Sequence, residues 1–314
     1  MRTATNAGGY LKRLERLNEY EAAVARLFPP LPRLWSITVA DALCLAHFLE
    51  CYARRVVVLD VGTFVGMSAF FFATQPRVVR VISVDANPTI AKEIDDKPGA
   101  VDTGVDFELL RNLRPLQVAQ SALAEFADER QKIELREGVV GSSQVSVQGS
   151  PSEDVEKIEV PVLELSKRLA LVAFIDGLHT EEAVRADLEA VFERNPHALA
   201  LLHDCRGAWG PYVQAGVAAF IETAQSEYRF QLFERWGPGL EPPNIGIVYP
   251  EADAAEVEHV LSEANSSLQL LKRSISLELQ DPLPALRLTT TAGIRKALRT
   301  SRAVRALLGK ASFA

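Results

Sequence analysis

Residues 56–68 read VVVLDVGTFVGMS, and the rest of the chain can be placed around them. The run from Val56 to Leu59 is apolar and mostly β-branched, which is typical of a strand buried on both faces of a parallel sheet. Asp60 and two glycines, Gly62 and Gly66, follow before an apolar run begins. Strand, glycine turn and helix place backbone N–H groups where they can face a ligand. The turn lacks the third glycine of the dinucleotide fingerprint, so a purely structural turn is the alternative.

A second apolar run, VVRVISV at residues 78–84, ends on Asp85, Ala86 and Asn87. An acid at the end of the second strand of such a unit is placed to accept hydrogen bonds from ribose hydroxyls. Asp85 lies about 20 residues beyond the glycine turn, as this geometry requires. The unit therefore predicts a nucleoside-binding site, although Asp85 as a plain helix N-cap is the alternative.

Further apolar runs predict the other strands and helices of a doubly wound α/β sheet. Strands are predicted at residues 115–122, 169–175, 198–202, 230–236 and 245–249. The loop between the last two is too short for a crossover helix, so these strands must pair antiparallel. Helices are predicted at residues 10–28, 36–52, 207–224 and 251–273, with another beginning after Thr180 as its N-cap. Residues 132–160 alternate between apolar and polar and contain many turn residues, which predicts an inserted β-hairpin; an exposed loop is the alternative.

Polar residues follow the predicted strands at the point where each strand ends. Ligands of open α/β sheets bind beyond the carboxyl ends of the strands, so these residues are expected to share one rim. They are Asp60, Asp85, Ser121, Asp176 with His179, and His203 with Asp204. Packing alone does not explain polar groups at five strand ends.

Four pieces of the chain resemble class I S-adenosylmethionine (SAM)-dependent methyltransferases: LDVGTFVGMSAFFFA, ISVDANPTIAKEI, FIDGLHTEEAVRADLEAV and ALALLHDCRG. Within that class they are similar to the catechol, caffeoyl-CoA and macrolide-sugar O-methyltransferases, and the predicted insert is similar to one in FkbM-like methyltransferases. The resemblance implies a mostly parallel, seven-stranded, Rossmann-like sheet with an antiparallel terminal hairpin. It also implies a methyltransferase domain at residues 35–250 with an insert at about 131–160. A helical cap at residues 1–34 and a helical extension at residues 251–314 would flank that domain.

The resemblance also implies roles for the residues of the rim. The glycine turn and the Ser68 hydroxyl would hold the methionine carboxylate, Asp176 would attract its ammonium, and Asp85 would bind the ribose. The end of the third strand lines the adenine pocket in the family. The implied cofactor-binding set is Asp60, Gly62, Phe64, Gly66, Ser68, Asp85, Ala86, Ser121 and Ala122.

His179 lies three residues beyond Asp176, where the catechol-type family carries its catalytic base. An imidazole titrates near neutrality and can take the proton of an acceptor hydroxyl; a loop histidine is the alternative. The family binds Mg²⁺ through acids that match Asp176 and Asp204, but the next family ligand is Cys205 here. A thiol is a poor ligand for Mg²⁺, so the resemblance leaves open whether Mg²⁺, another divalent cation or no ion is needed.

Composition narrows the class of protein. The chain has 314 residues and a net charge of −7, which argues against nucleic acid as the main partner. Three cysteines at irregular spacing, no long apolar run and no secretory signal favour a cytoplasmic protein. The segment 281–314 has seven basic residues against one acid. As an amphipathic helix it would suit the inner membrane surface, a neighbouring subunit of a homo-oligomer, or solvent.

The leading hypothesis is a SAM-dependent O-methyltransferase that acts on a small-molecule hydroxyl. The catalytic residues would be His179 and Asp176, and a sugar or other natural product is favoured over a simple catechol as the acceptor. Trp209, Tyr212 and Trp236 follow strand ends and would suit an acceptor pocket, or core packing. The competing hypotheses are a nicotinamide-dependent oxidoreductase on a related sheet and a non-catalytic SAM-binding protein.

Overall fold

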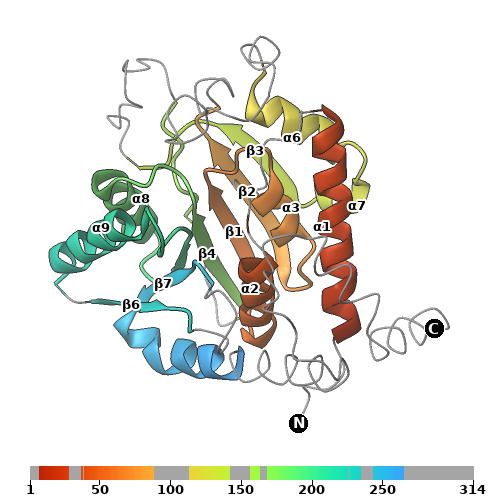
Figure 1. Ribbon diagram of the computed structural model, residues 1–314. Coiled ribbons are helices and arrows are strands. Elements are labelled where there is room, and N and C mark those ends of the chain that lie inside the picture. The colour runs from red at the N-terminus through yellow and green to blue at the C-terminus, as the bar shows by residue number, and fades with distance from the viewer. Residues whose placement is uncertain are drawn as a thin grey trace.

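The structure, a computed structural model, describes residues 7–27, 37, 39–87, 113–141, 156–162, 168–225, 227–234 and 243–264. Its centre is a seven-stranded sheet in the order β3-β2-β1-β4-β5-β7-β6 (Figure 1). The strands are β1 (Arg55–Val61), β2 (Val78–Asp85), β3 (Ile133–Glu137), β4 (Leu169–Ile175), β5 (Leu199–Leu202), β6 (Tyr228–Leu232) and β7 (Gly246–Pro250). Strands β1 to β5 pair in parallel, and β7 runs antiparallel to both β5 and β6. The predicted fold class and the antiparallel hairpin are confirmed.

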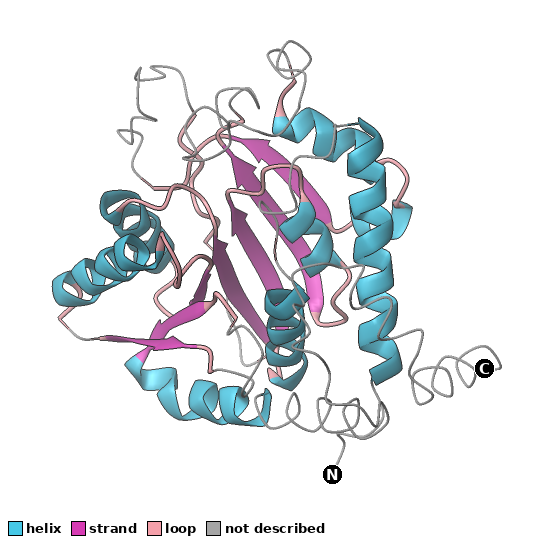
Figure 2. Cartoon of the chain, viewed as in Figure 1, coloured by secondary structure: helices cyan, strands magenta, loops and turns pink. Residues whose placement is uncertain are grey.

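Helices cover both faces of the sheet, as Figure 2 shows. One face packs on α1 (Ala7–Leu27), α2 (Val39–Cys51), α3 (Met67–Ala73), α6 (Pro115–Leu123) and the helical residues 254–264. The other face packs on α8 (Glu181–Arg194) and α9 (Gly210–Thr223). Two one-turn helices, α7 (Ala127–Arg130) and η3 (Glu251–Asp253), complete the described elements. Strand β1 is central, and six of its seven residues are buried, which accounts for its unbroken apolar run.

The predicted third strand is wrong. Residues 115–122 form helix α6, whose buried side chains recur at helical spacing and whose first turn holds Pro115. The third strand is β3, IELRE, which lies within the range predicted to form the inserted hairpin. It pairs in parallel with β2 and ends with Glu137 beside Asp85. Because β3 is a half-buried edge strand, its alternating pattern resembles that of a hairpin.

The remaining predictions differ in smaller ways. The last two strands are confirmed as a pair, but β6 begins two residues before the predicted run and ends at Leu232. The predicted hairpin falls mainly on residues 142–155, which lie outside the described residues. So do Trp236 and the basic segment 281–314. Among the described helices, none is both long enough and apolar enough to cross a membrane.

Candidate active site

The glycine turn between β1 and α3 is shaped by contacts within the protein. Gly62 and Gly66 both have positive φ, 83° and 81°. A Cβ on Gly62 would lie 2.3 Å from the carbonyl oxygen of Asp176, so only glycine lets this turn approach the end of β4. A Cβ on Gly66 would lie 2.6 Å from the hydroxyl of Tyr20 on α1. Close packing of the turn against β4 and α1 therefore requires glycine at both positions.

Asp85 faces the glycine turn, as predicted from its spacing. Its Oδ2 accepts a hydrogen bond from the backbone N–H of Phe64 at 2.8 Å, and its Oδ1 accepts one from the N–H of Asn87 at 2.6 Å. Burial raises the pKa of this carboxyl, and the two backbone N–H groups oppose that shift. Each carboxylate oxygen can accept a second hydrogen bond. Asp85 is thus fixed in place with acceptor capacity remaining, and Ala86 beside it is half-buried.

Asp60 is the second-last residue of β1, just before the glycine turn, and is fully buried. Its Oδ2 accepts hydrogen bonds from Ser83 Oγ at 2.7 Å and from Ser68 Oγ at 3.0 Å, and Ser83 is its partner across β1 and β2. Burial raises the pKa of Asp60 to about 6. The Ser68 hydroxyl is therefore donated to Asp60 in this structure, and its predicted contact with a methionine carboxylate has no support from the geometry.

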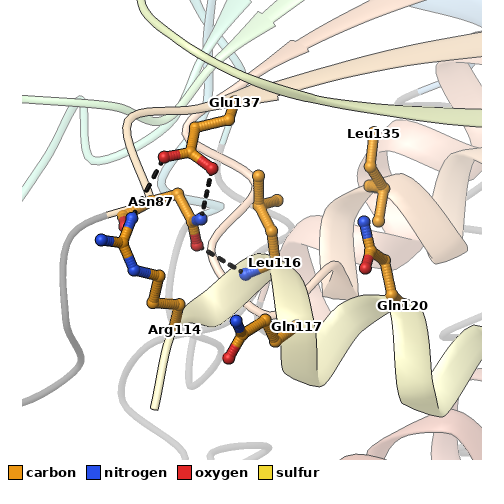
Figure 3. A pocket seen from close by; sticks show the side chains of 7 residues that line it. All are labelled: Asn87, Arg114, Leu116, Gln117, Gln120, Leu135 and Glu137. Carbon is orange, nitrogen blue, oxygen red and sulfur yellow. Dashed lines mark hydrogen bonds and ion pairs between the residues drawn. The ribbon is translucent and has the colours of Figure 1, made fainter. Parts of the chain in front are cut away.

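The assignment of Ser121 and Ala122 to an adenine pocket depended on the strand that is absent. Both residues lie on α6, where Ser121 is exposed and Ala122 is buried in the core. Between α6 and β3 lies a pocket of about 340 Å³, shown in Figure 3. It is lined by Asn87, Arg114, Leu116, Gln117, Gln120, Leu135 and Glu137. Since Asn87 lines it and also donates its N–H to Asp85, Asp85 stands between the glycine turn and this pocket.

The ends of β4 and β5 bring two histidines and two acids together. His203 Nδ1 lies 3.0 Å from Asp176 Oδ1 and 3.6 Å from Asp204 Oδ1. His179 Nε2 lies 3.1 Å from Asp204 Oδ2 and 3.4 Å from Asp176 Oδ1. The angles at His179 do not suit a hydrogen bond, so this buried nitrogen has no hydrogen-bond partner among the described residues. The predicted acids and His179 are thus in one cluster, with His179 Nε2 facing the two carboxylates.

Two members of this cluster were missed in the sequence. Asp41 on α2 is fully buried, and its Oδ2 lies 3.4 Å from His203 Nε2. Asn244, in the loop before β7, donates its side-chain N–H to Asp204 Oδ1 at 2.6 Å and its backbone N–H to Asp41 Oδ1 at 2.7 Å. Asp41 lies in a helix that has the pattern of core packing, and Asn244 lies in a Gly/Pro loop. Neither position carries a motif that could have revealed it.

The charges of the cluster are set by mutual contact. Burial alone would lower the pKa of His203, but the carboxylates of Asp176 and Asp41 outweigh it and hold that pKa well above its usual value. Burial likewise would raise the pKa of Asp176, but His203 and His179 hold it below its usual range. A cationic imidazole between carboxylates therefore stabilises this end of the sheet.

Cys205 is turned away from the cluster. It is buried, its Sγ donates to the carbonyl oxygen of Leu202 at 3.3 Å, and burial raises the pKa of the thiol to about 12. The donor atoms of Asp176, His203 and Asp204 all lie within 4.8 Å of one another. Two carboxylates and an imidazole fit a divalent ion of borderline softness better than Mg²⁺, which prefers oxygen ligands only.

Two aromatic rings lie beside His179. The ring of Trp209 stacks against that of His179 with centroids 5.7 Å apart and planes 26° apart. Tyr212 lies 6.4 Å further along, ring centre to ring centre, and is mostly exposed. Two of the three predicted acceptor aromatics are therefore placed beside the cluster, and Trp236 lies outside the described residues.

Comparison with known proteins gives distant structural likenesses. No family model and no curated protein matches the sequence. An O-methyltransferase of Streptomyces achromogenes, TomG, solved with SAM, is 17% identical with a TM-score of 0.42, over 80% of this chain and 99% of that one. An O-methyltransferase of Bacillus cereus, solved with S-adenosylhomocysteine (SAH), is 17% identical with a TM-score of 0.42, over 76% and 89%. An rRNA methylase of Streptococcus thermophilus is 13% identical with a TM-score of 0.33, over 65% and 92%.

These likenesses include the class of protein that the sequence resembles, the SAM-dependent O-methyltransferases. They also include an rRNA methylase, so likeness at this distance does not choose an acceptor. The chain's own strand order is the firmer finding, with five parallel strands closed by an antiparallel pair. The chain therefore has the Rossmann-like, seven-stranded fold that the methyltransferase resemblance implies.

Proposed function

We propose that this chain is a SAM-dependent O-methyltransferase that methylates a hydroxyl of a small molecule, with a sugar or other natural product as the favoured acceptor. The observation that carries the proposal is the hydrogen bond from Phe64 N–H to Asp85, because it joins the glycine turn to the acid expected to bind ribose. The catalytic cluster lies at the ends of β4 and β5, which are neighbours of β1 in the same sheet. Cofactor and acceptor would thus meet on one rim.

The cofactor half of the rim suits a cationic nucleoside. Asp85 has acceptor capacity for the ribose hydroxyls, and the backbone of the turn approaches the N-terminus of α3. Asp60 and Asp176 place negative charge behind the turn, which favours the sulfonium and ammonium groups of SAM. The adenine would extend from Asp85 toward the pocket beside Asn87. The absence of the third glycine of the dinucleotide fingerprint from the turn favours SAM over a nicotinamide cofactor.

The chemistry assigned to the protein is positioning and proton removal. Methyl transfer from a sulfonium is an in-line displacement by the acceptor oxygen, so the protein must hold the two reactants in near-attack geometry. His179 Nε2, which lies 3.4 Å from Asp176 Oδ1 and 3.1 Å from Asp204 Oδ2, would take the hydroxyl proton. Asp176 and Asp204 flank that nitrogen and stabilise the imidazolium that forms. Asp41 positions His203 behind them.

A divalent ion is a second element of the proposal. Asp176, His203 and Asp204 would hold it, and Asp41 would support His203 as a carboxylate often supports a metal-bound histidine. When bound, the ion would polarise the acceptor hydroxyl as a Lewis acid. Without an ion, the imidazolium of His203 supplies positive charge at the same place.

The cysteines bear on the cellular setting. Cys44, Cys51 and Cys205 are all unpaired, which supports the reducing cytoplasm as the compartment. Contact of the basic C-terminal segment with an anionic membrane surface or a second subunit remains part of the proposal, as does a homo-oligomer. Pelleting of the full chain with anionic vesicles and light scattering would test the two.

The direct test is binding followed by transfer. The purified chain should carry SAM or SAH, detectable by mass spectrometry, and should bind added SAH but not NADH in calorimetry. Label from methyl-tritiated SAM should then pass to members of a panel of hydroxylated ring compounds.

Loss of transfer after EDTA, with recovery on adding Mn²⁺ or Zn²⁺, would support the metal; undiminished transfer would exclude an essential ion. SAH binding without transfer to any acceptor would favour the non-catalytic alternative, and tight NADH binding would contradict the proposal.

A further inference from the structure

Asn87, just beyond the end of β2, connects the cofactor half of the rim to both walls of the neighbouring pocket (Figure 3). Only 4% of its surface is exposed. Its side-chain N–H donates to Glu137 Oε2 at the end of β3 at 2.9 Å, and its Oδ1 accepts the N–H of Leu116 in α6 at 3.1 Å. Its backbone N–H donates to Asp85, and its carbonyl oxygen accepts from Arg114 at 3.3 Å. One residue thus joins β2, β3 and α6 at the place proposed for the nucleoside.

The bond to Leu116 supplies a cap that α6 lacks in its own sequence. The N-cap residue Arg114 makes no side-chain cap hydrogen bond, and Pro115 has no N–H to donate. The N–H of Leu116 is therefore the first in the helix that needs an acceptor, and Asn87 Oδ1 provides it from outside the helix. Removing this side chain would leave a buried N–H group unpaired and would loosen the start of α6.

The backbone of Asn87 is left-handed, with a φ of 53°. Asparagine and glycine adopt this conformation more readily than other residues. Here it turns the N–H back toward Asp85, two residues earlier, where it bonds to Oδ1 at 2.6 Å. The N–H of Phe64 holds the other carboxylate oxygen. One bond to each oxygen fixes the plane of the carboxylate, so Asn87 and Phe64 together set the directions in which Asp85 can accept further hydrogen bonds.

The neighbouring ion pair is a weaker tie between the same walls. Arg114 and Glu137 lie 3.1 Å apart, but their side chains are 46% and 58% exposed. Exposed pairs contribute little to stability, because water and salt screen them. The buried amide of Asn87 bonds to α6 and to β3 at once, in a place where an unpaired polar group is costly. The width of the pocket between α6 and β3 therefore depends mainly on Asn87.

We infer that Asn87 is a positioning residue of the cofactor site: it holds the carboxylate of Asp85 in the orientation that binds ribose, and it fixes the width of the pocket toward which the adenine extends. The inference rests on the proposed function and adds a residue to its binding site. Asn87 acts through Asp85 and α6, so losing its side chain should weaken cofactor binding by removing preorganisation.

Asn87→Gly separates the side chain from the backbone. Glycine keeps the left-handed conformation and the N–H that bonds to Asp85, but it cannot make the two side-chain bonds. SAH affinity of the full chain, measured by calorimetry, should fall about 10-fold.

The matched control is Asn195→Ala, a change at another buried asparagine. The amide of Asn195 donates to the carbonyl oxygen of Pro161 at 3.0 Å, and the residue lies between the end of α8 and the start of β5, at the edge of the sheet opposite the rim. Both variants should unfold at lower urea concentration than wild type, but the control should keep SAH affinity within about two-fold. A loss of SAH affinity shared by the control would show a general effect of stability and would overturn the inference.

A reversal of hydrogen-bond polarity tests the position of the side chain directly. Asn87→Asp keeps an acceptor for Leu116 but sets a carboxylate against Glu137, so SAH affinity should fall about 10-fold or more. Adding Glu137→Gln restores a donor for the new carboxylate and returns the pair to its original net charge. The double variant should therefore recover SAH affinity to within about three-fold of wild type.

The comparison of the single and double variants decides the question even if Asn87→Gly fails to fold. A double variant that binds SAH no more tightly than Asn87→Asp would overturn the inference, as would wild-type SAH affinity in Asn87→Gly. A wild-type chain that fails to bind SAH would instead refute the proposed function, on which the inference rests.

Discussion

The two halves of the strand-end rim are built by different means. In the cofactor half, at β1 and β2, buried polar groups bond to backbone or hydroxyl groups nearby: Asp85 accepts two backbone N–H groups, and Asp60 accepts two serine hydroxyls. In the acceptor half, at β4 and β5, charged side chains contact one another, and one nitrogen of His179 lacks a hydrogen bond within the described structure. The proposed roles follow this difference: binding of the cofactor for the first half, and removal of the acceptor proton for the second.

Backbone strain marks both halves. Four non-glycine residues in the described part of the chain have positive φ, and three of them, Phe64, Asn87 and Asp204, lie just beyond the ends of β1, β2 and β5. Such conformations cost about 1–3 kcal/mol each and persist where surrounding contacts impose them. Their position at the rim agrees with a functional site there.

Removing the reactive group of the acceptor half should have the largest effect. His179→Gln keeps a polar side chain but cannot take a proton, so label transfer from SAM to an accepted ring compound should fall about 100- to 1,000-fold. SAH affinity should hardly change, because the ring of His179 contacts Asp176, Asp204 and Trp209 at the ends of β4 and β5. Calorimetry and a transfer assay on one preparation separate the two. If SAH affinity fell as much as transfer in His179→Gln, the two halves would not have separate roles.

Asp85→Ala is the converse change in the cofactor half. It removes the ribose acceptor and frees the N–H groups of Phe64 and Asn87, so SAH affinity should fall on the order of 100-fold. Trp209 and His179 stay in place, so the rate of methyl transfer at saturating SAM should fall less than SAH affinity does. Comparison with His179→Gln at matched SAM concentrations gives the test. Undiminished SAH affinity in Asp85→Ala would remove the observation that carries the proposed function.

The same difference explains which parts were predictable from sequence. The cofactor half is local: strand, turn, helix and second strand lie within residues 55–87, and the hydrogen bond between Phe64 and Asp85 spans only 21 positions. The acceptor half joins elements that are distant in the sequence. Asp41 contacts His203, which is 162 positions away, and Asn244, which is 203 positions away. No periodicity or spacing records such contacts.

The error at the third strand has another cause. PLQVAQSA is short and mostly apolar, and a run of this length suits a strand or one side of a helix. Its buried residues, among them Leu116, Val118, Ala119 and Ala122, face α1 and the sheet in a helical pattern. The edge strand β3, with its half-buried alternating residues, had the weaker signal. Edge elements beside a long connection are therefore the least certain part of such a prediction.

Tyr20→Phe tests whether the N-terminal helix belongs to the cofactor half. Tyr20 is fully buried on α1, stacks on Phe70 with ring centres 4.3 Å apart, and donates its hydroxyl to Val65 O in the glycine turn at 2.9 Å. Phenylalanine keeps the packing but leaves that carbonyl unpaired, at about 1–3 kcal/mol. We expect SAH affinity to fall about 10-fold, a change measurable by calorimetry. Tyr52→Phe is the control. Tyr52 is also buried but follows the end of α2, so its change should leave SAH affinity unchanged. Equal affinities in both variants would limit the cofactor half to β1 and β2.

The smallest effect on activity is expected at a buried carboxylate that belongs to neither half. Asp187 on α8 accepts a hydrogen bond from the N–H of Gly141 at 2.9 Å, and burial raises its pKa to about 7. An unfolded aspartate titrates near 3.9, so between these values the native state binds more protons than the unfolded state. The contribution of Asp187 to stability is therefore fully present below about pH 4 and is lost as pH rises through about 7.

Asp187→Asn keeps an oxygen acceptor for Gly141 and cannot ionise, so it should flatten this decline. Three pKa units correspond to an upper estimate of about 4 kcal/mol, and the measured gain at pH 8 relative to pH 5 should be a fraction of it. Urea unfolding of the variant and wild type at the two pH values measures the difference. SAH affinity and methyl transfer at fixed pH should be unchanged, because Asp187 bonds to a loop rather than to the rim. If transfer fell instead, the loop after β3 would have to be counted with the site, and the rim would contain a third functional region.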